Sequence, residues 1–445
     1  MDTEKYRSAL SRLPEGIRAA EIYCGALRSF EAALRAGELE RYSVSEKSAV
    51  SLRADCGKIG YAYTEDPADD PFRLIEQAQK NAAAIDDPDE QTIFPGAKEY
   101  APAPDVDPAL SSASAEEKLE LVRSLEKAAL SQDPRIEKLG WCQLSTEEGE
   151  TRIVNSLGLS LCQRSGIVVA YVSPVATIDG VTKDGTGYRI GRSLKEIDVD
   201  AVAKEAAEDL FSQFGAVQPA SGVYGAVFKN EAMAALLNVF SDMFSADEAQ
   251  KGLSLLVNRE GEKIASEAVD ILDDPLMEGA LIARAFDDEG VPAQKTVVVE
   301  KGVLKTLLHN RKTAKIANRE TTGNAGKPSV AGAVGVAPCN FHIVPNGCSL
   351  DRLLEQLGEG VLISEVSGLH AGCNPVSGAF SALARGFMVR NGKRAEPIEQ
   401  ITVSGNFLGL LKNVSAVGND LKFGINGLNV GAPSVLVSEV TVAGK

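Results

Sequence analysis

Apolar and polar residues alternate along several stretches of the first half of the chain. Residues 50–55 alternate in this way, and residues 59–63 do so again after a turn at Gly57. A period of two is typical of a β-strand with one buried face. We therefore predict a hairpin over residues 50–63 with one face in the core. Residues 136–173 predict further antiparallel strands, with breaks at 148–149 and at 155–158.

Other stretches repeat apolar residues every three or four positions, which is the period of a helix. Asp70 followed by Pro71 predicts a helix start, because proline at the first helical position loses no hydrogen bond. Ser114 and Glu117 form a capping box ahead of a second helix. Residues 200–214 predict a third helix, and a short one follows Ser349 and ends at Gly358.

The stretch 217–222 contains a proline, a serine and a glycine, and it is the best candidate for a domain boundary. Strand patterns dominate beyond it, including an Asn391-Gly392 pair that favours a type I′ hairpin turn. We predict an α+β protein with two domains, residues 1–216 and 222–445. The first is expected to be an antiparallel sheet with helices, and the second a β-rich, twisted or barrel-like sheet.

Composition narrows the class of protein. The net charge of -16 argues against a nucleic-acid partner, since such a surface needs a basic footprint. No apolar run approaches the roughly 20 residues that span a bilayer, so no membrane partner is expected. Seven cysteines without a C-x-x-C pair do not indicate a disulfide framework or a zinc ribbon. We expect a cytoplasmic protein with reduced cysteines.

Six short runs rich in glycine, acidic and amide residues follow one another in the C-terminal half. They are residues 284–292, 302–305, 321–325, 359–363, 367–378 and 417–421. One such run is weak evidence, because these residues mark turns in many proteins. The ordered series resembles the TldD/TldE family, and within it the TldE type, also called PmbA.

The resemblance implies a cytoplasmic peptidase of two different subunits. In that family the TldD subunit carries His-Glu-x-x-x-His on a helix, and TldE is its partner. Two imidazoles on such a helix can hold zinc while the carboxylate takes a proton from zinc-bound water. The resemblance also implies a cysteine ligand shortly after the 417–421 run in the peptidase subunits, and none occurs from Leu421 to Lys445.

The corresponding helix in this chain is predicted over residues 231–244, capped by Asn230. Carrying the motif over places Asn238 and Val239 at the first histidine and the glutamate, and Met243 at the second histidine. No histidine precedes His309, so a shift of one turn does not restore the motif. We therefore expect no metal and no catalytic residue in this chain, and zinc in the TldD-type partner.

The remaining candidates have ordinary structural readings. His370 and Cys373 are close in sequence, but a zinc site needs three or four ligands. His309 and His342 are expected to be hydrogen-bonded structural residues. The acidic run 287–289 is read as a charged turn before a glycine, ahead of the alternative that it binds a cation or a basic partner.

Three glycines follow the predicted strand 361–366, at Gly368, Gly372 and Gly378. Glycines allow close approach of another backbone, so an extended peptide could add here as a strand, with His370 beside it. An ordinary strand-joining loop is the alternative, and the family resemblance favours the cleft.

The sequence thus predicts the non-catalytic subunit of a TldD/TldE-like zinc metallopeptidase that cleaves unstructured peptides. The family also carries the label of a modulator of DNA gyrase. Two alternatives stay open. One is a homodimeric peptide-binding scaffold that acts alone, and the other is a hydrolase with an unrecognised site.

Overall fold

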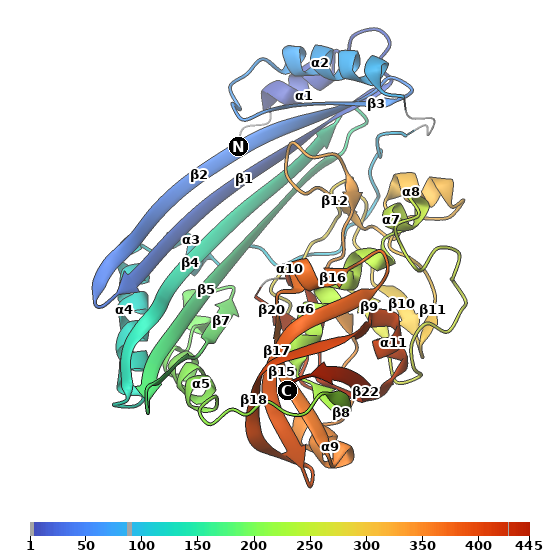
Figure 1. The fold of residues 1–445 in the computed structure, drawn as a ribbon. Helices are drawn as coiled ribbons and strands as arrows, with labels where there is room; N and C mark the ends of the chain where they lie inside the picture. The colour runs from blue at the N-terminus through green and yellow to red at the C-terminus, as the bar shows by residue number, and fades with distance from the viewer. Residues whose placement is uncertain (1–3, 87–90, 426) are drawn as a thin grey trace. The chain divides into compact units, whose positions relative to one another are not determined.

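The chain forms two compact units in the computed structural model, which describes residues 4–86, 91–425 and 427–445 (Figure 1). Unit 1 contains Met1–Phe214, Ala283–Ala293 and Ala325–Gly335. Unit 2 contains Gly215–Ile282, Gln294–Asn324 and Val336–Lys445. Two segments from the second half of the sequence therefore belong to the unit that the first half builds.

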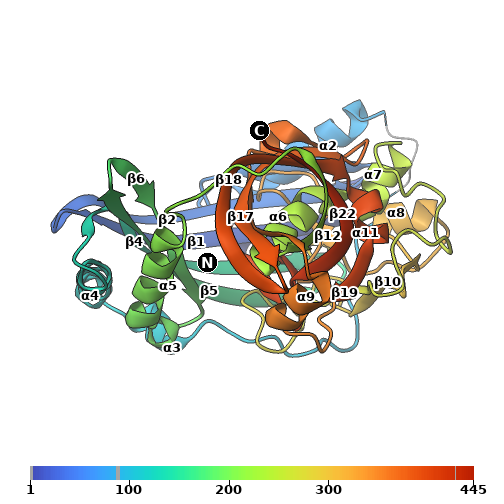
Figure 2. The same cartoon turned by 60° about the horizontal axis from the view of Figure 1, so that its bottom comes forward.

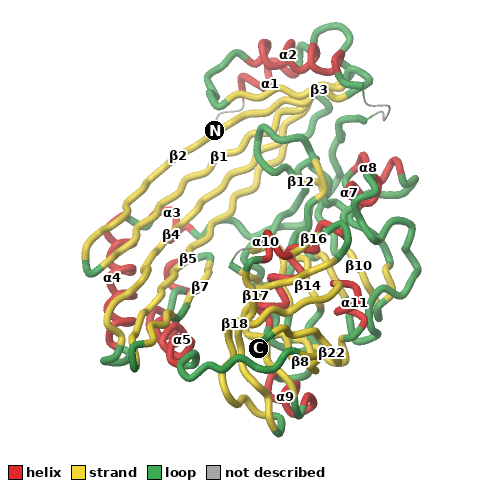
Figure 3. Tube along the Cα trace, viewed as in Figure 1, coloured by secondary structure: helices red, strands yellow, loops and turns green. Residues whose placement is uncertain are grey.

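Unit 1 is built on one antiparallel sheet with four long strands, drawn in yellow in Figure 3. Its strands are β1 (Ala19–Arg35), β2 (Glu38–Asp55), β3 (Ile59–Thr64), β4 (Ile136–Asn155), β5 (Ser160–Ile178), β6 (Val181–Asp184) and β7 (Gly187–Gly191). The order is β3-β2-β1-β4-β5-β6, and β7 also pairs with β5. The later segments add the short pair β12 (Ala325–Gly326) and β13 (Gly335–Val336).

Helices cover the two ends of this sheet. They are α1 (Glu4–Leu10), α2 (Pro71–Ala84), α3 (Pro108–Ser112), α4 (Ala115–Ser131), the 3₁₀ helix η1 (Leu194–Glu196) and α5 (Val199–Phe211). Helices α4 and α5 bury one apolar cluster against the sheet, and α1 and α2 bury another. Gly60 makes the second contact possible, because a Cβ there would lie 1.8 Å from the carbonyl oxygen of Ala78 in α2.

Unit 2 contains a closed sheet and a second, open one. The strands of the first are β8 (Gly222–Phe228), β15 (Gly360–Ser367), β16 (Cys373–Asn374), β17 (Ala379–Arg390), β18 (Lys393–Asn406), β19 (Val414–Val417) and β22 (Val435–Ala443). The order β15-β8-β22-β18-β17 closes because β17 also pairs with β15. The open sheet has the order β11-β10-β9-β14-β21-β20, with β9 (Ile271–Asp273), β10 (Thr296–Glu300), β11 (Val303–Leu304), β14 (Phe341–Ile343), β20 (Lys422–Gly424) and β21 (Gly427–Ala432).

The largest apolar core of the protein lies in unit 2. Its helices are α6 (Asn230–Phe240), the 3₁₀ helix η2 (Ser241–Phe244), α7 (Ala246–Gln250), α8 (Arg311–Ile316), α9 (Leu350–Leu357), α10 (Leu369–Gly372) and α11 (Phe407–Lys412). Figure 2 shows the strands of the closed sheet curving around α6. The rings of Phe240 in α6 and Phe407 in α11 stack with centroids 4.6 Å apart. Among the described residues, no helix is both long and apolar enough to cross a membrane.

The predicted fold class is confirmed, with an antiparallel curled sheet in the N-terminal part and a closed sheet in the C-terminal part. The helix starts at Asp70 and Ser114 are also confirmed: Asp70 accepts the N–H of Phe72, and Ser114 and Glu117 form a reciprocal capping box. Asn391 and Gly392 have φ values of 50° and 72°, as a type I′ turn requires.

Two strand predictions are wrong. The predicted hairpin exists as β2 and β3, but only one of its faces was expected to be buried. Leu52 pairs with Ala62, so Tyr61 and Tyr63 lie on the face opposite to Leu52. Both faces are buried there, because Leu52 is 0% and Arg53 only 3% exposed. Strand β4 also continues through Gly149, which pairs on both sides, with Leu27 and with Ser165. Hydrogen-bonded strands on both sides keep Gly149 in the sheet. The predicted break at 155–158 is confirmed, because β4 ends at Asn155.

Candidate functional site

Helix α6 is the element on which the resemblance places the zinc motif of the peptidase subunits. Asn230 is its first residue and not its cap, because the capping position is Lys229. The backbone N–H of Asn230 donates to the Ser434 hydroxyl (3.0 Å), and its side-chain amide donates to the Asp420 carbonyl (2.8 Å). The Asp420 carboxylate accepts the N–H and the hydroxyl of Ser434 (2.8 and 2.7 Å). The 417–421 run therefore fixes the start of α6.

The three positions that correspond to the motif have different surroundings. Asn238 and Val239 are half-buried, and a Cβ on Gly427 would lie 2.5 Å from the side-chain oxygen of Asn238. Met243 is 1% exposed and belongs to η2, because the α-helix ends at Phe240. Zinc is held by imidazole, thiolate or carboxylate groups. An amide, an isopropyl group and a thioether packed in an apolar core do not fit such a site.

The three histidines lie on separate elements. His309 is 2% exposed, its Nδ1 is 3.3 Å from the Thr313 hydroxyl, and burial followed by the Arg319 charge lowers its pKa to about 4. His342 in β14 is buried with its Nδ1 2.7 Å from the Asn340 carbonyl oxygen. The structural reading of both is confirmed, whereas His370 is exposed on α10. Within the described ranges, no three His, Cys, Asp or Glu side chains are grouped so as to hold a metal ion.

The three glycines of the predicted peptide cleft differ in what surrounds them. Gly372 packs on β17, because a Cβ there would lie 1.9 Å from the carbonyl oxygen of Ser381. Gly378 has a φ of 71° and lies against Asn406. Gly368 also has a positive φ, 69°, but open space surrounds its missing side chain. The fold itself therefore explains Gly372 and Gly378, while Gly368 and His370 form an exposed pair at α10.

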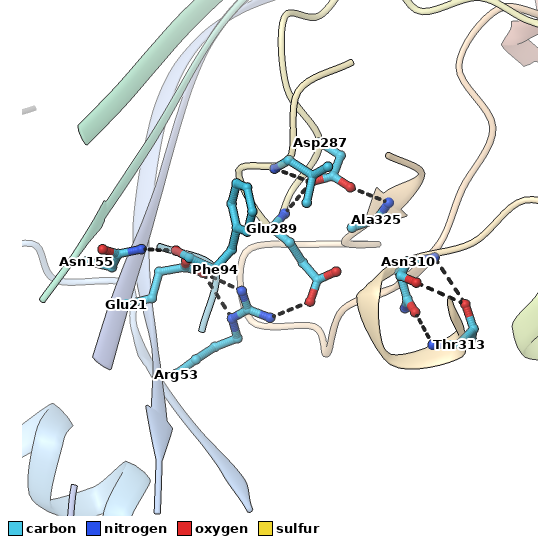
Figure 4. Close-up of polar contacts among 10 residues, drawn as sticks. Glu21, Arg53, Phe94, Asn155, Asp287, Glu289, Asn310, Thr313 and Ala325 are labelled. Carbon is cyan, nitrogen blue, oxygen red and sulfur yellow. Dashed lines mark hydrogen bonds and ion pairs between the residues drawn. The ribbon is translucent and has the colours of Figure 1, made fainter. Parts of the chain in front are cut away.

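The acidic run 287–289 is not the solvated turn that its charge predicts. Asp287 is 0% and Glu289 is 4% exposed. One oxygen of Asp287 accepts the N–H groups of Glu289 (2.9 Å) and Val291 (3.0 Å), and the other accepts that of Ala325 (2.9 Å) (Figure 4). Burial, followed by the Glu289 charge, raises the pKa of Asp287 to about 7. Asp287 therefore joins the two later segments of unit 1.

Arg53 is the centre of a buried ionic cluster in unit 1 (Figure 4). Its guanidinium donates to one oxygen of Glu21 from two nitrogens (3.0 and 2.6 Å) and lies 3.3 Å from a Glu289 oxygen. All three side chains are 5% exposed or less. Burial raises the pKa of Glu21 against the opposing effect of Arg53, and the two carboxylates raise the pKa of Arg53 against its own burial. The sequence analysis missed this cluster.

The local sequence pattern carries no signal for this cluster. Arg53 occupies a polar position in a strand whose apolar positions are buried, so the alternation predicts that it faces solvent. Glu289 lies more than 200 residues away, and nothing in the local pattern links it to Arg53. A row of polar residues on a strand gives the same sequence pattern whether water covers it or a segment from later in the chain does.

The folded chain is an α+β protein with an antiparallel sheet in its first unit and a closed sheet in its second. Three models of one family match it: residues 20–82 match domain 1 of the PmbA/TldA metallopeptidases, residues 108–213 the central domain and residues 221–444 the C-terminal domain. The chain belongs to the PmbA/TldA metallopeptidase family, which confirms the resemblance drawn from the six runs.

Individual relatives match almost over their whole length. A metalloprotease of Methanothermobacter thermautotrophicus is 29% identical and is aligned over 99% of this chain and 96% of its own. The structure of a Thermotoga maritima protein described as a candidate modulator of a DNA gyrase is 33% identical, with a TM-score of 0.88 over 96% of both chains. TldE from Thermococcus kodakarensis has the same fold at 24% identity, with a TM-score of 0.87 over 97% of this chain and 98% of its own.

Proposed function

We propose that this chain is the non-catalytic subunit of a heteromeric TldD/TldE-like zinc metallopeptidase that cleaves unstructured peptides. In this proposal a TldD-type partner holds the zinc and the catalytic carboxylate. This chain contributes a wall of the peptide cleft and the surface that meets the partner.

The composition of α6 and η2 carries the proposal. The resemblance to the TldD-type subunits places the zinc motif on this helix, where this chain has Asn238, Val239 and Met243. Met243 is enclosed by the core that also contains Phe240 and Phe244. These groups neither bind zinc nor take a proton from water, so hydrolysis requires a second subunit.

Gly368 and His370 are the parts of the predicted cleft that are free to meet a peptide, and Gly372 and Gly378 shape the loop behind them. His370 is exposed on a four-residue helix directly after β15. In the assembled enzyme, His370→Ala is expected to raise the KM for the peptide several-fold while leaving the zinc content unchanged. Lys393→Ala, at an exposed position of β18, is the matched control.

The test measures zinc and peptide cleavage on the same three samples: this chain, a TldD-type subunit, and their purified complex. We expect stoichiometric zinc only where the TldD-type subunit is present, and cleavage of an unstructured fluorogenic peptide to be fastest in the complex. Stoichiometric zinc in this chain alone would overturn the proposal. So would cleavage by this chain alone that a point change in its own residues abolishes.

We also propose a cytoplasmic location. All seven cysteines are free thiols, as expected of a protein in a reducing compartment.

A further inference from the structure

One face of the sheet in unit 1 is hollowed. Residues that pair across antiparallel strands point to the same face. The register places two adjacent rows on this face: Ala49, Gly25, Thr151 and Gln163, followed by Lys47, Leu27, Gly149 and Ser165. Gly25, Ala49 and Gly149 have no side chain or only a methyl group, so the surface of the sheet is recessed at these positions. The resulting pocket has a volume of about 900 Å³.

The later segment 325–335 forms one wall of this pocket. A Cβ on Gly25 would lie 2.5 Å from a methyl carbon of Val330, so the glycine lets the segment approach the sheet. Asp288 fixes the segment and the floor together. One of its oxygens accepts the backbone N–H of Lys327 (2.7 Å), and the other accepts the Tyr23 hydroxyl (3.1 Å).

Lys327 is one of the residues that line this pocket. The ammonium donates to the Ser51 hydroxyl (3.0 Å) and lies 5.0 and 5.9 Å from the ring centroids of Tyr23 and Tyr61. Among the residues that the structure describes, no carboxylate oxygen lies within 4 Å of it. Burial, followed by the Arg53 charge, lowers the pKa of Lys327 to about 8. At neutral pH the group is therefore a poorly solvated cation with two unused N–H donors.

We propose that this pocket binds a carboxylate group of a peptide, with the Lys327 ammonium as its counter-ion. The peptide nature of the ligand rests on the proposed function. A singly charged carboxylate suits the site better than a phosphate dianion, because Glu65 also lines the pocket and would repel additional negative charge. The Tyr23 ring lies beside the ammonium, and a charge-assisted hydrogen bond is stronger in such a low-dielectric setting.

Calorimetric titration of the full chain with three short peptides tests this site. The probes are acetyl-trialanine with a free carboxylate, the same peptide as its amide, and acetyl-Ala-Asp-Ala amide. We expect at least one carboxylate-bearing peptide to bind ten or more times more tightly than the neutral amide. Preference for the first identifies a chain end as the ligand, and preference for the third identifies an acidic side chain. Equal affinities, or no binding of any probe, overturn the proposal.

Variants separate Lys327 from the general charge of the pocket. Lys327→Met is expected to weaken carboxylate binding at least tenfold, while Lys327→Arg retains it. Lys47→Met removes the other lysine that lines the pocket and is expected to change the affinity less than threefold. A loss with Lys47→Met as large as with Lys327→Met would contradict the assignment. Circular dichroism and thermal unfolding establish that each variant is folded.

The dependence on pH provides a second readout. The wild-type affinity should fall about tenfold from pH 7 to pH 9, as Lys327 loses its proton, and Lys327→Arg should remove this fall. Glu21, Arg53, Tyr61 and Asp288 also face Lys327, and they are unchanged in both proteins. These titrations use neither the partner nor hydrolysis, so they can fail or succeed independently of the zinc and cleavage test.

Discussion

Lys327, which is half-buried, and Arg53, which is buried, are cations of unit 1 with opposite electrostatic surroundings. Arg53 contacts two carboxylates, which raise its pKa although burial alone would lower it. The pKa of Lys327 falls, because burial outweighs the more distant Asp288 and Glu21. The charge on Arg53 therefore stabilises the fold, while the charge on Lys327 destabilises it, and each contribution can be measured.

Replacing Lys327 by methionine should stabilise the protein at neutral pH. The pKa falls from about 10.4 in an unfolded chain to about 8 in the folded one, so the unfolded state binds more protons between these values. The penalty is fully present below pH 8 and disappears as the pH rises towards 10.4. It amounts to at most about 3 kcal/mol. Urea unfolding of Lys327→Met and wild type at pH 7 and pH 10 measures it.

Lys47→Met serves as the control and should leave the free energy of unfolding nearly unchanged. If Lys327→Met were no more stable than wild type at pH 7, the charge on Lys327 would be compensated in the folded protein.

Replacing Arg53 by methionine should have the opposite effect. It leaves Glu21 and Glu289 buried without their cation, which typically costs about 3–5 kcal/mol. Without Arg53 the pKa of Glu21 rises further above its value in the unfolded chain. The variant therefore loses stability as the pH rises from the pKa of Glu21 in the unfolded chain towards its higher pKa in the folded chain. The cost should be larger at pH 8 than at pH 5, as measured by chemical denaturation.

The ion pair of Arg152 with Glu150 is the comparison, since its two side chains are 32% and 21% exposed. Arg152→Met should cost less than about 1 kcal/mol at either pH. A similar cost for both substitutions would mean that water reaches the Arg53 cluster.

At the scale of single elements, α6 is held by contacts at its start and along its apolar side. Its start is fixed by Asp420 and Ser434, and its apolar side packs into the core of unit 2. The start of the helix is therefore held by contacts that do not involve positions 238, 239 or 243.

Placing a histidine at position 243 or 238 should affect stability unequally. Met243→His places a polar ring in an apolar core and should cost about 2–5 kcal/mol. Asn238→His, at a half-buried position, should cost much less. Guanidinium unfolding of the two variants measures the difference, and equal costs would show that η2 can open to admit solvent.

Elements that depend on local chemistry were predictable from the sequence. The capping box of Ser114 and the turn at Asn391 need only residues a few positions apart. The errors at β3 and β4 arose where a third element decides the outcome. Periodicity cannot tell that α2 covers one face of the β2–β3 hairpin while Arg53, on the other face, is enclosed by an ion pair to Glu289.

At the scale of the whole molecule, the sequence boundary between residues 216 and 222 stays a prediction. The compact units differ from a simple division in sequence, because 283–293 and 325–335 belong to unit 1. Glu289, Asp287 and Lys327 all lie in these two segments. The runs 284–292 and 321–325 identified the family, yet their physical role could be recognised only when distant strands were placed beside them.

Removal of metal should distinguish this chain from the assembled enzyme. A ligand that binds the folded state raises the Tm, so stripping a bound ion lowers it. We expect EDTA to leave the Tm of this chain unchanged and to abolish peptide cleavage by the complex with a TldD-type subunit. A fall of several degrees for the isolated chain, restored by zinc, would contradict our assignment of the metal to the partner.

The two later segments of unit 1 also set an order of events during synthesis. The N-terminal half of a protein usually folds first as it leaves the ribosome. The ion pair of Arg53 with Glu289 can form only after Glu289 has been translated. The hydrogen bond from the amide of Ala325 to the carboxylate of Asp287 can form only after Ala325 has been translated. The N-terminal unit is therefore complete only after residue 335 has been translated.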